Sequence, residues 1–245
     1  MIQKSIFILF VCFLVQYCEG FKLPPYFSQC SRSDPKLHEC ILHNANGGLS
    51  AFVKGDKMYN IQSMLPLYIP HISLPIDRDL RVNLSDSIIG DLSTAKIKDV
   101  KIDLEDKRLE IAMYMSRATL LGQYKIKGKI SILPIDEKGP VNITVVHSRI
   151  KYSFDYDIIE RKDKHYINIT DSSMTYKSER SFFKFYNLFS ENAILGDVIN
   201  DSLNEHWTET NREIAPKIAS ALSKIATSSL QGFFEKIPYE ELMRD

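Results

Sequence analysis

Apolar residues recur at helical spacing over the last fifth of the chain, from about residue 193 to residue 234. Charged residues such as Glu213 and Lys217 occupy the opposite side, so the pattern predicts one long helix with a single buried face. Pro216 predicts a kink in this helix, and Gly232 lies near its end. The apolar stripe consists of Leu195, Ile199, Leu203, Trp207, Ile214, Ile218, Leu222, Ile225 and Phe233.

The apolar period changes to two between about residues 80 and 189, which is typical of half-buried antiparallel strands. Turns are expected at 105–107, 136–140 and 161–164, so the strands would have roughly eight to twelve residues and curl. The inward positions include Leu109, Ile111, Met113, Met115, Leu120, Tyr124, Ile126, Ile150, Tyr152, Phe154 and Tyr156.

The helix stripe alone also fits a simple core helix or a coiled-coil strand, but a coiled coil would have few strands elsewhere. A sheet with one apolar face and a long one-sided helix pack best when the sheet wraps the helix. We therefore predict an α+β fold in which a highly curved antiparallel sheet encloses the C-terminal helix. Its Met and aromatic side chains can fill a core or line a cavity, and composition is compatible with both.

The first residues have the pattern of an export signal. Lys4 is followed by an apolar run at 6–15 that is too short to span a bilayer, and Gly20 suits cleavage. We expect residues 1–20 to be removed, residues 21–245 to form a single domain, and the protein to be secreted to the extracellular space without stable membrane insertion.

Four cysteines are present, and two of them, Cys12 and Cys18, lie within the expected signal. Cys30 and Cys40 remain, and in an oxidising compartment they should form a disulfide. Two thiols supply at most half of a zinc site, so we expect no metal.

The segment between these cysteines predicts the start of a short helix, with Asp34 as its N-cap, Pro35 as its first residue and Leu37 buried. Gly47 and Gly48 are expected to interrupt this helix. The apolar stretch at 65–70 contains two prolines, which predict an extended segment that packs against the long helix or lies at an edge, rather than a central strand.

Four triplets match acceptors of N-linked sugar, at Asn83, Asn142, Asn168 and Asn200. Asn200 falls inside the predicted helix and is the least suited. Asn83, Asn142 and Asn168 are therefore the candidate glycosylation sites.

The chain carries 31 basic and 31 acidic residues, so its net charge is zero. Without a basic excess, neither nucleic acid nor an anionic membrane surface is an expected partner. The sequence also lacks a nucleophile elbow, a His-Glu-x-x-His motif and a glycine-rich phosphate loop, and its histidines are scattered. We predict neither an enzyme nor a cofactor.

Three motifs in order, the segments 30–40, 203–207 (Leu-Asn-Glu-His-Trp) and 236–242 (Lys-Ile-Pro-Tyr-Glu-Glu-Leu), resemble the insect takeout and juvenile-hormone-binding protein family. The resemblance extends over the whole mature chain. It implies the tubular lipid-binding architecture, an interior tunnel for a small apolar ligand, and secretion into haemolymph, saliva or sensory fluid. The hormone-carrier branch has a second disulfide for which this chain lacks the cysteines, so the chain is nearer to the takeout branch.

We therefore predict a monomeric secreted carrier for a juvenile-hormone-like terpenoid, a fatty acid or another lipid. The alternative is a secreted interaction or immune-modulating protein whose interior is filled by side chains and which acts through a surface patch. The residues expected to line the tunnel are Leu203, Trp207, Ile214, Ile218, Met113, Met115, Tyr124, Tyr152 and Phe154. The hydroxyls expected to orient the ligand are those of Tyr68, Tyr114, Tyr124 and Tyr152, and ordinary core or surface packing is the alternative role of each residue.

Overall fold

The structure of the protein, a computed structural model, describes residues 21–76, 78–130 and 132–245, and the expected signal at 1–20 lies outside them. The helices are α2 (Leu37–Lys54), α3 (Ala193–Glu205), α4 (Trp207–Phe234) and α5 (Tyr239–Leu242), with short turns η1 (Lys57–Tyr59) and η2 (Leu92–Thr94). The strands are β1 (Cys30–Ser31), β2 (Leu67–Pro75), β3 (Arg81–Gly90), β4 (Lys96–Asp103), β5 (Arg108–Ile130), β6 (Leu133–Arg161), β7 (Lys164–Lys177), β8 (Arg180–Phe185) and β9 (Met243–Arg244).

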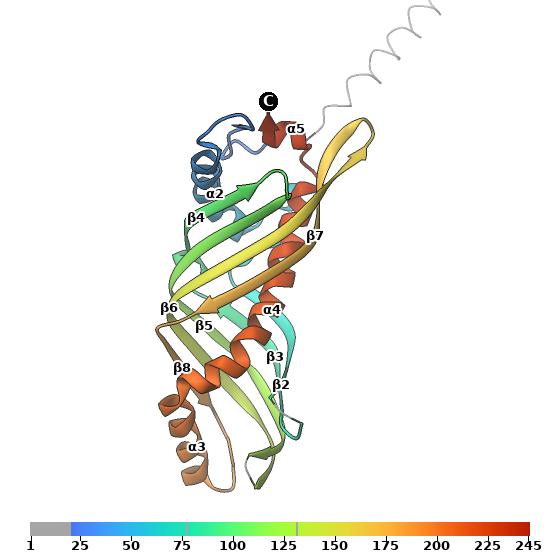
Figure 1. The fold of residues 1–245 in the computed structure, drawn as a ribbon. Coiled ribbons are helices and arrows are strands. Elements are labelled where there is room, and N and C mark those ends of the chain that lie inside the picture. The colour runs from blue at the N-terminus through green and yellow to red at the C-terminus, as the bar shows by residue number, and fades with distance from the viewer. Residues whose placement is uncertain (1–20, 77, 131) are drawn as a thin grey trace, which may run out of the picture.

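Seven strands form one antiparallel sheet in the order β2-β3-β5-β6-β7, with β4 beside β5 and β8 beside β6. Figure 1 shows this sheet curling around α4 in an elongated molecule. We call the end with α2 and α5 the upper end, and the end with α3 the lower end. The prediction of a curled antiparallel sheet around a C-terminal helix is confirmed, and so is the edge position of the proline-rich segment, which begins β2.

The alternation along each strand places apolar side chains on the inner face. One lateral row shows this clearly: its members are register partners on five neighbouring strands, and none is more than 7% exposed. This inner row consists of Leu67, Ile89, Leu120, Ile143 and Phe183. Burial of such a row favours closure of the sheet over α4, because the free energy falls when each apolar side chain leaves water.

Two strands are much longer than predicted, because β5 has 23 residues and β6 has 29. The expected turn at 136–140 is wrong: these residues pair with β5 throughout. Pro140 is accommodated because its carbonyl accepts a hydrogen bond from Tyr186 N at 2.9 Å, which requires no N–H from the proline.

The prediction of a single continuous helix from about residue 193 to residue 234 is also wrong, since α3 ends at Glu205 and α4 begins at Trp207. His206 between them has φ −97° and ψ 38°, outside the helical region. Carbonyls next to the break have side-chain donors, because Arg180 donates to Asn204 O at 2.8 Å and Thr210 Oγ1 donates to Leu203 O at 3.3 Å. Pro216 lies inside α4, which continues through it.

The break lets α3 lie along the free edge of β8 (Figure 1). Asn200 accepts from Phe185 N at 2.8 Å and donates to Phe185 O at 2.9 Å. Asn204, one turn later, makes the same pair of bonds with Phe183, at 2.9 and 2.7 Å. The two amides therefore satisfy an edge strand that would otherwise expose its backbone groups.

The first helix differs from its prediction at both ends. Asp34 accepts from Lys36 N at 2.8 Å in a turn before the helix, so Pro35 is not helical and α2 begins at Leu37. The expected interruption at Gly47 and Gly48 is wrong, because α2 runs through both. A Cβ on Gly48 would lie 2.3 Å from the ring of Phe27, so the missing side chain serves packing rather than a helix break.

Candidate functional site

A cavity of about 370 Å³ lies in the upper half of the molecule. Its walls come from α2, from the last three turns of α4, and from the inner faces of β4, β5, β6 and β7. The sheet contributes Ile111, Met113 and Phe154, while Ile225 and Leu230 face them from α4. In this half α4 and the sheet leave a space between them, and α2, which packs against β4, lines that space as well.

The cavity is almost wholly apolar. None of the described residues that line it is Asp, Glu, Lys, Arg or His. The polar side chains among them are Ser28, Asn44, Tyr152 and Tyr156. The site can therefore desolvate an apolar molecule but offers no charge to pair with an ion.

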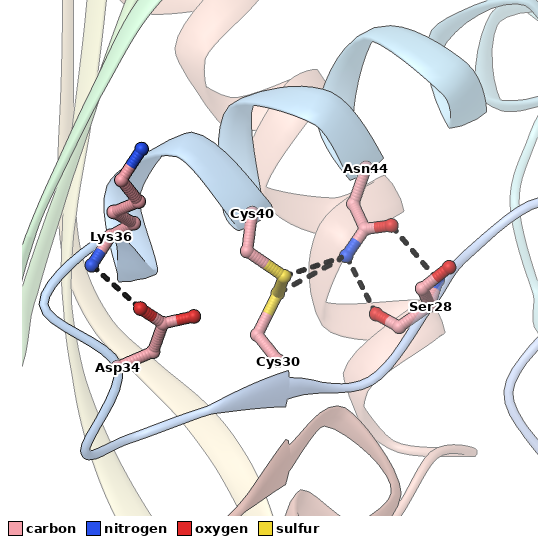
Figure 2. The surroundings of a disulfide bond; sticks show 6 residues. All are labelled: Ser28, Cys30, Asp34, Lys36, Cys40 and Asn44. Atoms are coloured by element: carbon pink, nitrogen blue, oxygen red, sulfur yellow. Dashed lines mark hydrogen bonds between the residues drawn. A yellow bond between two sulfur atoms is a disulfide. The ribbon is translucent and has the colours of Figure 1, made fainter.

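The disulfide between Cys30 and Cys40 is present, with Cα atoms 6.0 Å apart, and it fixes α2 to the N-terminal segment. Figure 2 shows Asn44 beside it. Asn44 Oδ1 accepts from Ser28 N at 2.8 Å, and its Nδ2 donates to Ser28 O at 2.6 Å and approaches the Cys30 Sγ at 3.2 Å. The amide is therefore already occupied in holding the wall of the cavity together.

An N-terminal and a C-terminal strand meet at the upper end. Strand β1 pairs in parallel with β9, and Leu242 and Met243 line the cavity from there. His165 Nδ1 lies 2.6 Å from Glu240 Oε1, which ties α5 to β7. The C-terminal motif 236–242 therefore contributes Leu242 to the cavity wall and is held against β7.

Tyr152 begins a hydroxyl network between the sheet and α4. Its OH lies 2.7 Å from Thr227 Oγ1, and Thr227 donates to Ser172 Oγ at 2.7 Å. Burial raises the pKa of Tyr152 above its ordinary value, and the hydrogen bonds to Thr227 and Ser172 offset only part of this rise. The phenol is therefore neutral at physiological pH, like the rest of the lining.

The structure brings together four of the nine residues predicted to line a tunnel: Met113, Met115, Tyr152 and Phe154 line the cavity. The other five, Leu203, Trp207, Ile214, Ile218 and Tyr124, lie in or against the filled core of the lower half. The stripe on α4 continues past them, and its cavity-lining members are Leu222, Ile225, Ala226, Leu230, Phe233 and Phe234.

Of the four candidate hydroxyls, that of Tyr152 is the one on a cavity-lining residue. Tyr68 is 54% exposed and donates to Asp86 at 2.9 Å. The hydroxyl of Tyr114 lies 2.6 Å from His147 Nδ1. The hydroxyl of Tyr124 donates to Tyr186 O at 2.9 Å in the lower core. These three hydroxyls therefore have structural partners elsewhere.

Sequence reasoning missed the contribution of α2. Ile41, Ala45, Leu49 and Phe52 line the cavity at helical spacing. That spacing was visible in the sequence, but the expected break at Gly47 and Gly48 concealed it.

The described residues contain no helix that is both long and apolar enough to cross a membrane. Within the same ranges, no group of three or more His, Cys, Asp or Glu side chains is placed to hold a metal ion.

A family model described as haemolymph juvenile hormone binding protein matches residues 7–244. The circadian clock-controlled protein daywake of Drosophila melanogaster is 26% identical over 238 residues, 93% of this chain and 90% of that protein. Daywake of Drosophila yakuba is 28% identical over 222 residues, 85% of each chain. The crystal structure of Takeout 1 from Epiphyas postvittana has a TM-score of 0.78 at 24% identity, over 89% of this chain and 99% of that one, and has the same fold. Because the family model covers almost the entire sequence, this chain belongs to the haemolymph juvenile hormone binding protein family.

Proposed function

We propose that this chain is a secreted carrier that binds a small, uncharged apolar molecule in the upper cavity. The observation that supports this most directly is the cavity itself, about 370 Å³ with no charged side chain among its described lining residues. Its volume falls in the range of small-molecule sites, roughly 300–1,000 Å³. The family's name points to a hormone ligand, and the export-signal pattern at residues 1–20 of the sequence supports secretion.

Binding would be driven by desolvation. A ligand that buries roughly 300 Å² of apolar surface gains about 7–8 kcal/mol at about 25 cal/mol per Å². Loss of translational and rotational freedom offsets part of this gain, so burial of this area gives an affinity weaker than about 1 μM, which corresponds to roughly 8 kcal/mol. The five methionines in the lining, Met64, Met113, Met115, Met174 and Met243, can adjust to the shape of the guest.

The competing hypothesis is an interaction protein with a filled interior. A side-chain-filled interior describes the lower half but not the upper half, and this favours the carrier. Organic extraction of the purified protein, followed by mass spectrometry, tests the choice. Recovery of a lipid in molar proportion supports the carrier.

A binding titration with the neutral fluorescent probe N-phenyl-1-naphthylamine extends this test. Ala226→Phe should fill the cavity, because Ala226 lines it from α4, and should weaken probe binding about tenfold or more. Ser228→Phe is the matched control, since Ser228 is exposed two residues away on the same helix. Thermal melts of both variants serve as the check that each is folded. Equal probe affinity in the two folded variants, with no lipid recovered from the parent protein, would contradict the proposal.

A further inference from the structure

The outer face of the sheet carries an apolar stripe that the cavity does not explain. One residue along from the inner row on each strand, a second lateral row runs through Tyr68, Ile88, Leu121, Asn142 and Lys184. Its first three members are 54%, 41% and 51% exposed. These three residues, which we call the outer stripe, are neighbours on adjacent strands, so they form a continuous apolar surface rather than scattered contacts.

The stripe ends at a residue that can be modified. Asn142 is the register partner of Leu121 and begins the triplet Asn142-Ile143-Thr144. Ile143 is 5% exposed on the inner face, so strand alternation turns Asn142 and Thr144 outward. Thr144 Oγ1 donates to Asn142 Oδ1 at 3.1 Å, and no described residue accepts a hydrogen bond from Asn142 Nδ2.

The surface around Asn142 is hollowed. A depression of about 270 Å³ is lined by Asn142, Thr144, Phe182, Phe183, Lys184 and Asn204. Phe182 is 47% exposed and adds an aromatic ring at the rim. A sugar attached to Asn142 therefore has room beside it, with Leu121 on the β5 side and Lys184 and the ring of Phe182 on the β8 side.

The other triplets lie in different surroundings. Asn83 is the register partner of Ser73 and Lys125, and Asn168 is the partner of Asp157, so their flanks are polar. Asn200 is 3% exposed, and its amide is bonded to the backbone of β8. Asn142 alone among the four combines an available amide with an adjoining apolar surface.

We propose that Asn142 carries an N-linked glycan whose first sugars cover the outer stripe. The inference rests on the secretion that belongs to the proposed function. In the transfer, Asn142 Nδ2 forms a bond to the anomeric carbon of a lipid-diphosphate-linked oligosaccharide. The bond from that carbon to the diphosphate oxygen breaks, the amide loses one proton, and the lipid diphosphate leaves. The stripe extends over three strand spacings, about 14 Å, from Asn142 to Tyr68, so the glycan core lies along the strand row.

The first test is the mass of the peptide containing Asn142, taken from the full chain secreted by insect cells. We expect a glycopeptide, and enzymatic removal of the sugar should convert Asn142 to Asp. An unmodified Asn142 in secreted protein overturns the proposal. The same sample is titrated with N-phenyl-1-naphthylamine, so that failure of the carrier function is seen separately from failure of the modification.

The second test is self-association, measured by light scattering. Asn142→Gln should raise the associated fraction about twofold or more, because the stripe is uncovered. Leu121→Thr in the same chain should reverse this change, while Asn83→Gln is the matched control and should leave association unchanged. Association that is unaffected by Asn142→Gln, or that rises equally with Asn83→Gln, contradicts the covering role. If the parent protein dimerises through the outer stripe, this also contradicts the covering role.

Discussion

The two halves of the molecule use the same sheet and the same helix, yet one is filled and the other is hollow. In the lower half, Leu84 is fully buried and Tyr124 is 2% exposed within one continuous apolar cluster. In the upper half, residues such as Ile111 and Ile225 also point inward, but part of their surface faces the cavity. Strand alternation therefore determines which side chains point inward. It does not determine whether these side chains fill the space between the sheet and α4.

The halves differ in what covers the sheet and in the side chains that line it. In the lower half, β2 and β3 extend the sheet and α4 packs against β2 and β8. In the upper half, β4 borders β5 and α2 lies across it. Both halves contain β-branched residues, such as Ile69 and Val82 in the lower core and Ile111 and Ile225 around the cavity. Methionines, which can adapt their shape, concentrate around the cavity.

The largest expected effect comes from truncating matched leucines of β5, one in each half. Leu120→Ala should lower the free energy of unfolding by about 4 kcal/mol, because Leu120 is 5% exposed in the filled core. Leu109→Ala should cost about half as much, since Leu109 borders the cavity and loses fewer contacts. Urea denaturation of the ligand-free proteins measures both values. Equal losses would mean that the two halves are packed alike.

A second prediction uses ligand charge to test the hollow half. Dodecanoic acid should bind more weakly than its methyl ester, because the described lining residues include no cation to pair with a carboxylate. The acid can enter by taking up a proton. For a carboxyl pKa of about 4.3, this costs roughly 3–4 kcal/mol at pH 7, or a factor of 10²–10³ in affinity.

Displacement of N-phenyl-1-naphthylamine at several pH values checks the size of this difference. The gap between acid and ester should shrink about tenfold for each pH unit between 7 and 5, because protonation becomes easier. If the acid binds as tightly as the ester at pH 7, a cation must reach the cavity and the neutral-ligand proposal is wrong.

A third prediction compares a tyrosine from each half at alkaline pH. Burial raises the pKa of Tyr124, in the lower core, to about 12, and Glu137 adds to the rise. Burial likewise raises the pKa of Tyr156, which lines the cavity, to about 12, with further contributions from Tyr239 and Asp103. Because the folded state favours the neutral phenol, this stability is complete below about pH 10 and is lost as the pH rises towards about 12.

The expected loss is about 2–3 kcal/mol for each phenol, measured as urea stability against pH alongside tyrosinate absorbance. Tyr124→Phe and Tyr156→Phe should each remove one part of the alkaline loss. A neutral ligand should shift the titration of Tyr156 but leave that of Tyr124 unchanged, because Tyr156 lines the cavity and Tyr124 does not. An equal shift of both would place the ligand elsewhere.

Much of the fold could be predicted because it follows from alternation and periodicity, which are local. Met113 and Ile111 were correctly assigned to the inner face, and the stripe on the C-terminal helix was real. Lengths and breaks could not be predicted, because they depend on partners far away in sequence. Residues 136–140 have the composition of a turn, but their pairing with β5 makes them part of a strand. The break at His206 depends on the contacts of α3 with β8.

The family resemblance implied a cavity, whereas the residue pattern did not fix its position along the helix. A stripe along α4 does not reveal which turn faces empty space, since that depends on how wide the sheet is at each level. Ile214 and Leu222 have the same character and lie two turns apart, yet Ile214 is packed in the core and Leu222 lines the cavity. The role of α2 was missed because Gly48 suggested a break, whereas its partner is the ring of Phe27.

The smallest expected effect concerns Trp207, where the lower half meets the break between the helices. If this side chain were fully buried, Trp207→Ala would cost about 3 kcal/mol or more. Trp207 instead lies partly exposed at the start of α4, and the guanidinium of Arg180 lies 5.5 Å from its ring centroid. We therefore expect a loss of about 1–2 kcal/mol from reduced packing and the lost cation–π contact. Trp207→Phe should recover part of it, since a smaller ring still faces Arg180. Urea denaturation measures both variants, and a loss as large as that of Leu120→Ala would place Trp207 in the core.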